Sequence, residues 1–346
     1  MGGQVNHKEA ILIDASKNPG FRDVAEFAKV SITTVERVLN ERGSVSPKTR
    51  EKVLHAASQL GLRRVLPLPD YGNLRIEAIL PTNPTPYWAK LSNSFKNAAK
   101  LLPRGIMLHR TFVPENDPQA MIRAITASQL KRSALIVAAE LDSEVAESLA
   151  GVMEKGEILI FVSTRIPGLP AHAFSGVNNM AAGRLAASLI NFALRDKPAK
   201  VLILQANTTL QSHRDRVEGF RAELHTNHKS DVFVTHEAPN ASWGHLAELA
   251  KYGRLPDAIY ETADSGGEIA TILRKLDRKP IWIGHERNDA HEALIRERIL
   301  DFVLDQDPEK QARWALKAAL TELGVENSDL SYVEKPELRV FANANL

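Results

Sequence analysis

A short stretch of polar side chains between residues 31 and 40 offers the clearest chemistry in the sequence. Ile32 and Glu36 are four residues apart. Thr33 and Arg37 have the same spacing, so in a helix both pairs lie on one exposed face. That face combines a guanidinium, which donates paired hydrogen bonds to guanine, with an apolar side chain that suits the thymine methyl group. The spacing predicts a helical surface that contacts nucleic acid.

Three short helices are predicted to position this face, at residues 23–29, 32–39 and 47–60. The first directs Val24, Phe27 and Ala28 inward, because they recur at i, i+3 and i+4. Ser31 and Ser46 would cap the second and third helices. The inward positions of those two helices are Val35, Val38, Leu39, Val53, Ala56, Ala57 and Leu60. Two short helices joined by a tight turn and braced by a third can place one helix in the DNA major groove.

Charge supports this interpretation. Residues 18–64 carry nine Lys and Arg and five Asp and Glu, which gives +4, whereas the whole chain carries +2. A basic segment on a nearly neutral protein is what phosphate neutralisation requires. The alternative is a plain helical subdomain with a solvated basic surface.

The motifs of this segment resemble the DNA-binding domain of the lactose-repressor (LacI/GalR) family. They are Asp23-Val24-Ala25, Val30-Ser31, Thr34-Val35, Arg37-Val38-Leu39-Asn40, Val45-Ser46 and Thr49-Arg50. The resemblance implies a helix-turn-helix at residues 18–62 that binds a double-stranded DNA operator. The implied DNA contacts are Ser31, Ile32, Thr33, Thr34, Glu36, Arg37, Asn40, Ser46 and Thr49.

Different roles are expected of these contacts. Arg37 is the best candidate for a base or phosphate contact, and Ile32 and Thr33 stand where side chains reach base edges. The hydroxyl and amide side chains suit phosphate contacts that set register. Glu36 departs from the small serine usual in the family, so it either accepts from a cytosine amine or repels phosphate.

The linker that follows also departs from the family. Residues 63–74 contain Pro67, Pro69 and Gly72, which favour an extended connection. The family's hinge-helix pattern is missing, and two prolines at i and i+2 oppose a regular helix. Leu66 or Leu68 would be the minor-groove wedge if one exists. Residues 1–17 are predicted to be a flexible arm.

Residues 75–346 alternate apolar runs with segments of helical period. The runs are 76–80, 106–108, 134–138, 158–162, 201–204, 232–235, 258–260 and 281–284, with helices such as 180–194 and 217–224 between them. This alternation predicts an α/β core with parallel sheets flanked by helices, and its length favours two lobes. Ligands in this architecture bind at the carboxyl ends of the strands.

Enzyme motifs are missing from the sequence. It has no dinucleotide-binding glycine motif, Walker loop or nucleophile elbow, and its histidines lack metal-ligand spacing. The absence of cysteine excludes disulfides and a zinc finger. We therefore expect no enzymatic activity, cofactor or metal. Without a secretory signal or an apolar stretch long enough to span a bilayer, a cytoplasmic protein with no membrane partner is expected.

The core resembles periplasmic sugar-binding proteins and related repressor cores. The landmarks include Asn83 to Trp88, Asn178-Asn179, the 214–220 segment, Gly284-His285-Glu286 and Asp305 to Pro308. The resemblance implies an effector site between the lobes formed by Tyr87, Trp88, Arg165, Arg216, Asp264, Glu286 and Gln306. The alternatives are core packing for the two aromatic residues, surface positions for the two arginines and a turn position for the glutamine.

Several hydroxyl-binding side chains of the resembled site are replaced. Ala263 stands for a ligand-binding asparagine, and Thr164 stands for an aspartate, whereas two arginines remain. Arginine suits carboxylate or phosphate. The effector is therefore expected to be a sugar, a sugar acid or a polyol.

The small residues of the helix at 179–194 permit close packing. They are Ala181, Ala182, Gly183, Ala186 and Ala187. This face packs either against a second copy or against its own sheet. A homodimer or a dimer of dimers is expected, because two recognition helices must meet two half-sites.

These expectations describe a ligand-responsive transcriptional regulator that acts as a repressor. A small molecule would bind between the lobes and change the affinity for the operator, which requires different affinities for two states. Two alternatives are compatible with the sequence. One is a cytoplasmic solute-binding protein or sugar enzyme with an incidental helical head, and the other is an architectural DNA-binding protein with a vestigial pocket.

Overall fold

The structure is a computed structural model that describes residues 19–40, 45–62, 74–140, 142–195, 197–205, 210–227, 231–236, 244–263, 266–325 and 328–346. The arm at 1–17, most of the linker at 63–74 and Asp264 lie outside these residues. The predicted domain boundaries stay predictions.

The head consists of three helices, as predicted: α1 (Phe21–Ala28), α2 (Ile32–Leu39) and α3 (Pro47–Gln59). Ser31 Oγ and Ser46 Oγ accept hydrogen bonds from the backbone N–H groups of Thr34 and Thr49, so both predicted caps are confirmed. The helices enclose a small core in which Val24, Val35, Val38, Val53 and Ala57 are 0% exposed.

The inward position predicted for Phe27 is wrong, because this side chain is 47% exposed. Val24, Ala25 and Ala28 form the buried stripe of α1. Phe27 lies about 100° around the helix axis from the middle of that stripe. The alanines let the other two helices approach closely, and the larger ring is left outside.

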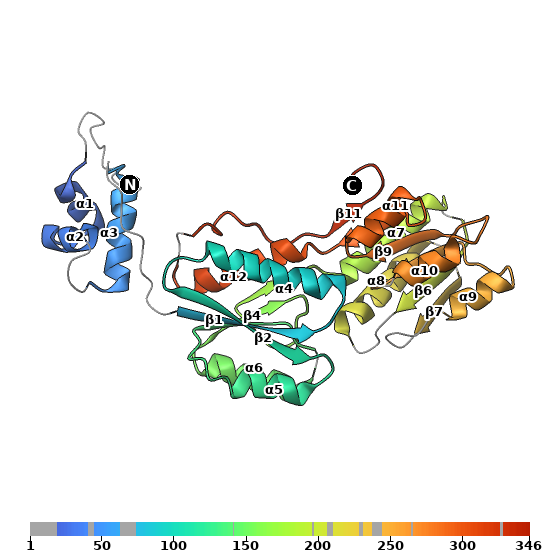
Figure 1. The fold of residues 1–346 in the computed structure, drawn as a ribbon, viewed down its shortest axis with the longest axis horizontal. Coiled ribbons are helices and arrows are strands. Elements are labelled where there is room, and N and C mark those ends of the chain that lie inside the picture. Colours follow the sequence, from blue (N-terminus) through green and yellow to red (C-terminus); the bar gives the residue numbers. More distant parts are fainter. Residues whose placement is uncertain are drawn as a thin grey trace, which may run out of the picture. The chain divides into compact units, whose positions relative to one another are not determined.

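The core contains two sheets flanked by helices, which confirms the predicted α/β two-lobe fold (Figure 1). The first sheet has the order β2-β1-β3-β4-β5, with strands Ile106–Pro114, Leu74–Thr82, Ala134–Val137, Ile158–Val162 and Ala173–Ser175. Helices α5 (Pro118–Thr126) and α6 (Ser143–Glu154) cover one face, and α4 (Pro86–Ala98) and α12 (Pro308–Glu322) cover the other. A short 3-10 helix, Ala99–Leu101, follows α4.

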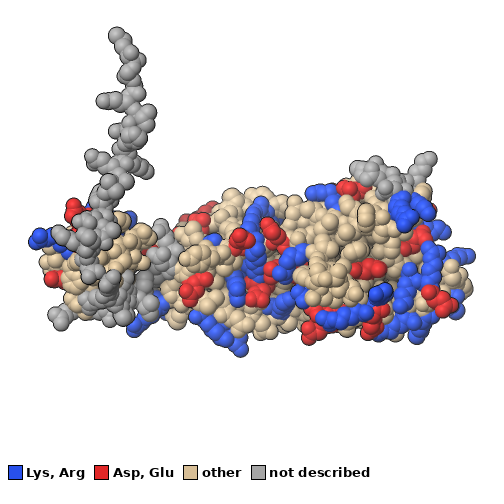
Figure 2. All heavy atoms as spheres, turned by 90° about the horizontal axis from the view of Figure 1, so that it is seen from above, with Lys and Arg blue, Asp and Glu red and all other residues tan. Residues whose placement is uncertain are grey.

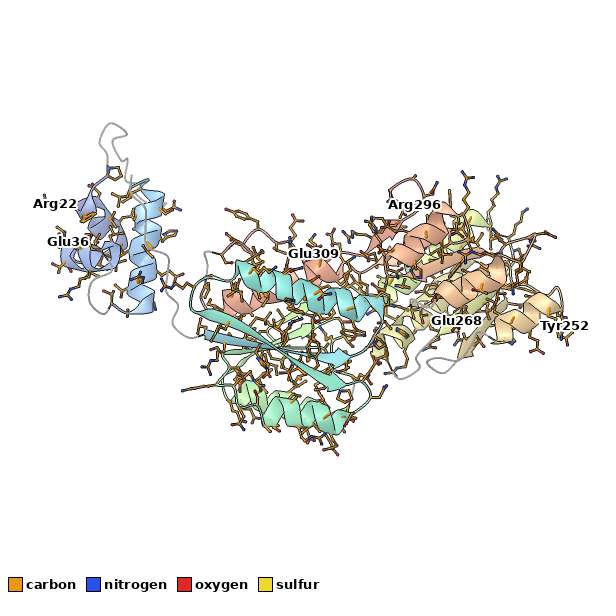
Figure 3. The ribbon with its side chains drawn as sticks, viewed as in Figure 1. Arg22, Glu36, Tyr252, Glu268, Arg296 and Glu309 are labelled. Carbon is orange, nitrogen blue, oxygen red and sulfur yellow. The ribbon has the colours of Figure 1, made fainter. Side chains whose placement is uncertain are left out.

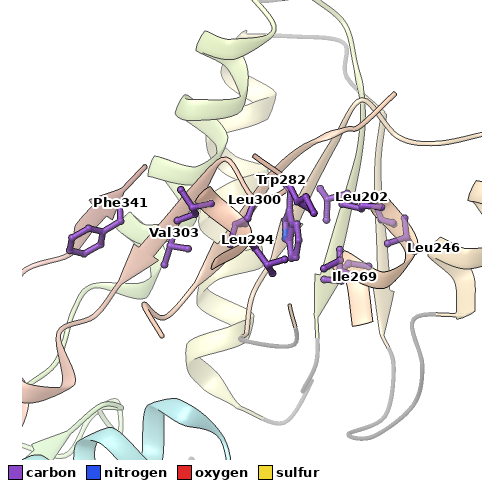
Figure 4. Packing of buried hydrophobic residues seen from close by; sticks show 14 residues of the cluster. Leu202, Leu246, Ile269, Trp282, Leu294, Leu300, Val303 and Phe341 are labelled. Carbon is purple, nitrogen blue, oxygen red and sulfur yellow. The ribbon is translucent and has the colours of Figure 1, made fainter. Parts of the chain in front are cut away.

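The second sheet has the order β11-β10-β9-β8-β6-β7. Its strands are Arg339–Phe341, Phe302–Asp305, Ile281–His285, Ala258–Glu261, Lys200–Gln205 and Asp231–His236. Strand β11 is antiparallel to β10, and the other pairs are parallel. Helices α7 (Asn179–Ala193) and α8 (Gln211–Asn227) pack on one face. The other face carries α9 (Gly244–Lys251), α10 (Gly266–Leu273) and α11 (Asp289–Arg296) around Trp282, as Figure 4 shows.

The chain passes between the lobes three times. Strand β5 belongs to the first sheet and α7 to the second lobe, whereas β10 belongs to the second sheet and α12 packs against α4 and β4 in the first lobe. The chain then returns to the second sheet at β11. These crossovers bring α4, the start of α12 and the ends of β8 and β9 together at one place.

Among the described residues, all eight predicted strands are present, although β2 extends six residues beyond the predicted run at 106–108, and three strands were missed. The missed strands are β5, β10 and β11, which have three or four residues each. Strands β5 and β11 have three residues each, and runs this short carry too little period to distinguish a strand from a loop.

Candidate functional sites

The outward face of α2 presents the side chains predicted to read DNA. Ile32 is 41% exposed, and Thr33, Glu36 and Arg37 are exposed as well. Figure 3 shows Glu36 projecting from α2. Because Val35 on the opposite side is fully buried, the packing of the head fixes which face of α2 points outward.

Two pairs of hydroxyl residues fix the starts of α2 and α3. Ser31 Oγ lies 3.1 Å from Thr34 N and 2.8 Å from Thr34 Oγ1. Ser46 repeats the arrangement with Thr49, at 3.3 and 2.8 Å. Helix starts of this kind favour phosphate groups, because backbone N–H groups point outward there. These four residues and Asn40 stay predicted phosphate contacts.

A buried arginine forms the centre of the candidate effector site. Arg216 on α8 is 3% exposed. Its Nε donates to Asn179 Oδ1 at 2.9 Å, and its Nη1 donates to the Thr262 carbonyl oxygen at 2.5 Å. Its Nη2 lies 3.9 Å from Glu286 Oε1. Protein acceptors therefore take two of the five N–H donors of this guanidinium.

A chain of hydrogen bonds connects this arginine to the first lobe. Gln306 Nε2 donates to Glu286 Oε1 at 2.5 Å. Gln311 Nε2 donates to the Gln306 carbonyl oxygen at 2.9 Å, and Gln311 Oε1 accepts from the Tyr87 hydroxyl at 2.9 Å. The first turns of α4 and α12 are thereby coupled to the loop after β9. Tyr87 and Glu286 also border a cavity of about 350 Å³ between the two lobes.

The environment keeps Tyr87 protonated. Burial raises the pKa of Tyr87, and the nearby Glu286 carboxylate raises it further. Tyr87 therefore donates to Gln311 as a neutral phenol and does not act as a base.

Three buried histidines lie beneath the cluster in the second lobe. Burial and the charge of Arg216 lower the pKa of His213 to about 3. Burial also lowers the pKa of His285, whose Nε2 lies 2.9 Å from the Tyr260 hydroxyl, and the pKa of His291. These imidazoles are neutral near pH 7, so they add no positive charge to the site.

The structure brings together four of the seven predicted effector residues, namely Tyr87, Arg216, Glu286 and Gln306. Trp88 packs edge-on against Tyr87, with the ring centres 5.0 Å apart, and lines a second cavity. Arg165 borders a third cavity together with Asn179. The Arg165 guanidinium stacks 5.0 Å from the centre of the Phe174 ring and borders a cavity of about 530 Å³ beside the start of α7. As direct ligands, all seven stay predictions.

Two members of the cluster were missed as site residues. Asn179 had been noted only as part of a motif, and Gln311 had not been noted. Gln311 is 0% exposed on the packed side of α12, where a buried amide requires partners. The position of Gln311 on the apolar face of its helix could have identified it as a member of the site.

The small face of α7 packs within its own chain. Ala182, Ala186 and Ala187 are 0% exposed and face the core that α8 and the second sheet share. A Cβ added to Gly183 would lie 2.0 Å from the Arg216 carbonyl oxygen. Of the two uses expected for this face, packing within the chain is the one observed.

The described residues contain no group of three or more His, Asp or Glu arranged to hold a metal ion. No helix in the described part of the chain is both long and apolar enough to cross a membrane. Figure 2 shows Lys and Arg interspersed with Asp and Glu over the visible face of the core.

Fold and site together define a two-lobe α/β binding protein that carries a helix-turn-helix head. The chain belongs to the periplasmic binding protein domain family, whose model matches residues 76–326. Residues 21–64 match the family of bacterial regulatory proteins of the lacI type. The predicted resemblance is confirmed for both parts.

The curated relatives include transcriptional regulators. The chain is 26% identical over 207 residues to the HTH-type transcriptional regulator DegA of Bacillus subtilis, a match that covers 58% of this chain and 59% of DegA. It is 56% identical over 39 residues to the ribose operon repressor of Halalkalibacterium halodurans, or 11% of this chain and 12% of that protein. The chain thus spans about three fifths of the length of DegA and an eighth of that repressor.

Solved structures share the fold of the core. A solute-binding protein of an ABC transporter from Burkholderia graminis, in complex with D-arabinose, aligns with a TM-score of 0.68. The sequences are 14% identical, and the alignment covers 80% of this chain and 97% of that one. At this identity the likeness shows the fold alone.

Proposed function

We propose that the protein is a sequence-specific DNA-binding transcriptional regulator, acting as a repressor in the cytoplasm, whose operator affinity is set by a small molecule bound between the two lobes. The observation that carries this proposal is the exposed face of α2, fixed by the packing of the head and presenting Arg37, Ile32 and Thr33. The match of the head to lacI-type regulatory proteins supports it. The names of DegA and the ribose operon repressor point the same way.

The effector class that fits the core is a sugar or a polyol. The site combines an aromatic side chain, three amides, a carboxylate and a guanidinium, which suits a ligand with several hydroxyl groups. A sugar acid was also expected, because two arginines remain. That argument is weaker for Arg216, which already donates to two protein acceptors, than for Arg165, which borders the cavity at the start of α7 together with Asn179.

A homodimer or a dimer of dimers belongs to the same proposal. Two DNA-reading heads are needed for two half-sites about one helical turn apart. The small face of α7 is buried within the chain, so the subunit contact must use another surface.

The test uses the full chain and DNA selected from genomic fragments. Fluorescence anisotropy should show a clear preference for a selected fragment over random competitor. Arg37→Ala should weaken specific binding by about 1–3 kcal/mol. Arg123→Ala, which removes an exposed arginine of α5 in the core, should leave operator affinity unchanged. Equal binding to all fragments by the unaltered protein would refute the proposal.

A further inference from the structure

A cavity of about 50 Å³ opens in the first lobe at the carboxyl ends of strands β1, β2 and β3. Trp88 supplies an aromatic wall, and Met121 and Val145 supply apolar walls from α5 and α6. Its size suits a small group and not a whole sugar, because a single water molecule already needs about 10–15 Å³ of such volume. Leu210, next to α8 of the second lobe, closes one side, so the cavity borders the space between the lobes.

Four carboxylates line this cavity, and two of them serve as helix caps. Asp117 Oδ1 accepts from Ala120 N at 2.8 Å, and Asp142 Oδ1 accepts from Val145 N at 3.0 Å. Their charge is therefore used locally at helix starts.

Glu115 and Glu140 are the two carboxylates that do not cap a helix. Glu115 Oε2 accepts from Asn83 Nδ2 at 2.8 Å, whereas Glu115 Oε1 is shielded from solvent and has no hydrogen-bond partner among the described residues. An ionised oxygen that is removed from water without a donor is costly. A ligand that brings a donor to this oxygen would remove that cost.

The two carboxylates also repel each other. Burial raises the pKa of Glu140, and the charge of Glu115 raises it further. A bond from the Asn116 backbone N–H and the charge of Arg214 on α8 oppose this shift without reversing it. Among the described residues that line the cavity, none is Lys or Arg. A cation placed between Glu115 and Glu140 would relieve the repulsion.

We infer that this cavity receives a positively charged ammonium group, so that the effector is an amino sugar or an amino polyol. The ammonium would donate to Glu115 Oε1 and to the Glu140 carboxylate and lie against the Trp88 ring, a combination that favours cations over neutral groups. The hydroxyl-bearing remainder would extend toward Tyr87 and Arg216 between the lobes. This inference rests on the proposed function, because it names the chemical class of that effector.

The test compares matched ligands on the full chain near pH 7. Thermal-shift and calorimetric titrations would use D-glucosamine, D-galactosamine and D-mannosamine as amines. The parent hexoses, the N-acetylated forms and the uronic acids remove or reverse the charge. We expect at least one amine to bind about tenfold or more tightly than its parent hexose, which corresponds to about 1.4 kcal/mol.

The variants Glu115→Gln and Glu140→Gln test the assigned carboxylates, because each keeps the size of the side chain and removes the charge. Each should reduce the preference for the amine over the parent hexose to about threefold or less, as expected when a charge-assisted bond becomes a neutral one. Glu147→Gln, at an exposed position of α6, serves as the matched control and should keep the full preference. Retained binding of the parent hexose by the variants would show that they are folded.

Two results would overturn the inference. One is the absence of a shift with every amine, and the other is binding of a neutral or acidic sugar as tight as that of its amine. Operator binding is measured on the same preparations. If a neutral sugar changes operator affinity as strongly as its amine does, the inference about charge is wrong and the proposed function still holds. If the protein shows no preference among DNA fragments, the proposed function itself is wrong.

Discussion

Gly183 on α7 packs directly against the backbone of Arg216 on α8, and a Cβ added there would lie 2.0 Å from the Arg216 carbonyl oxygen. A Cβ added to Gly219 on α8 would likewise lie 2.1 Å from the carbonyl oxygen of Met180 on α7. Two glycines thus bring the backbones of α7 and α8 into contact. This contact sets the position from which the Arg216 side chain reaches Asn179 and Glu286.

The close contact predicts that Gly183→Ala destabilises the protein. The added methyl group must push α8 away, and overpacking of this kind costs about 1–3 kcal/mol. The free energy of unfolding from urea titrations measures this change. Gly151→Ala in α6 is the matched control, because a Cβ there meets nothing within 4 Å. It should be stabilising by up to about 1 kcal/mol, since alanine is the better helix former. Equal effects of the two substitutions would contradict the contact.

Arg216→Met is expected to be strongly destabilising. The variant removes donors to Asn179 and to the Thr262 carbonyl oxygen and leaves Glu286 buried without its cation. Breaking a buried pair in this way costs about 3–5 kcal/mol. Arg274→Met removes a shorter ion pair, 2.8 Å from Glu297, in which both side chains are nearly half exposed. It should cost less than about 1 kcal/mol. Chemical denaturation of both variants measures whether the burial of an ion pair or the distance between its charges governs the loss of folding stability.

Stability should fall as the pH drops below about 6.5. Burial and Arg216 lower the pKa of His213 from 6.5 to about 3 in the folded protein. Between these values the unfolded chain binds a proton that the folded chain does not bind. The stabilisation is therefore present above pH 6.5 and is lost as the pH falls toward 3. His285 and His291 act in the same direction, because their pKa values are also lowered.

His213→Gln isolates one contribution to this pH dependence. The free energy of unfolding, measured by urea titration, should change less between pH 7.5 and pH 5 for the variant than for the unaltered protein. The two changes should differ by up to about 2 kcal/mol. His109→Gln on β2 removes an exposed imidazole and should leave the difference unchanged. The same pH dependence in both variants would argue against a neutral buried His213.

Glu36 should influence which base pairs the protein prefers. It is exposed on α2, one helical turn after Ile32, and we expect a carboxylate there either to accept from a cytosine amine or to repel phosphate. Selection from a random DNA library should therefore yield a different consensus for Glu36→Ser at one or two positions. A discriminating contact is worth about 1–3 kcal/mol. Glu26→Gln at an exposed position of α1 should return the original consensus. An unchanged consensus for Glu36→Ser would assign this side chain no part in base reading.

Local sequence determined the elements and their buried faces over most of the chain. The capping roles of Ser31 and Ser46, the span of α2 and its buried side followed from spacing alone. So did eight of the strands. The reason is that a helix or strand directs its side chains with a fixed period, so that an apolar stripe indicates which side is buried. The choice between seven candidate effector residues did not follow from spacing.

Tertiary structure decided which polar groups meet. Arg216 finds acceptors 37 and 46 residues away, and Tyr87 bonds to a glutamine 224 residues away. No local pattern encodes such distances, because the crossovers between the lobes bring these groups together only after both sheets have formed. The exposure of Phe27 and the contact of α7 with α8 were decided in the same way. The sequence by itself determined what each element presents, and the packing of the elements determined what each side chain touches.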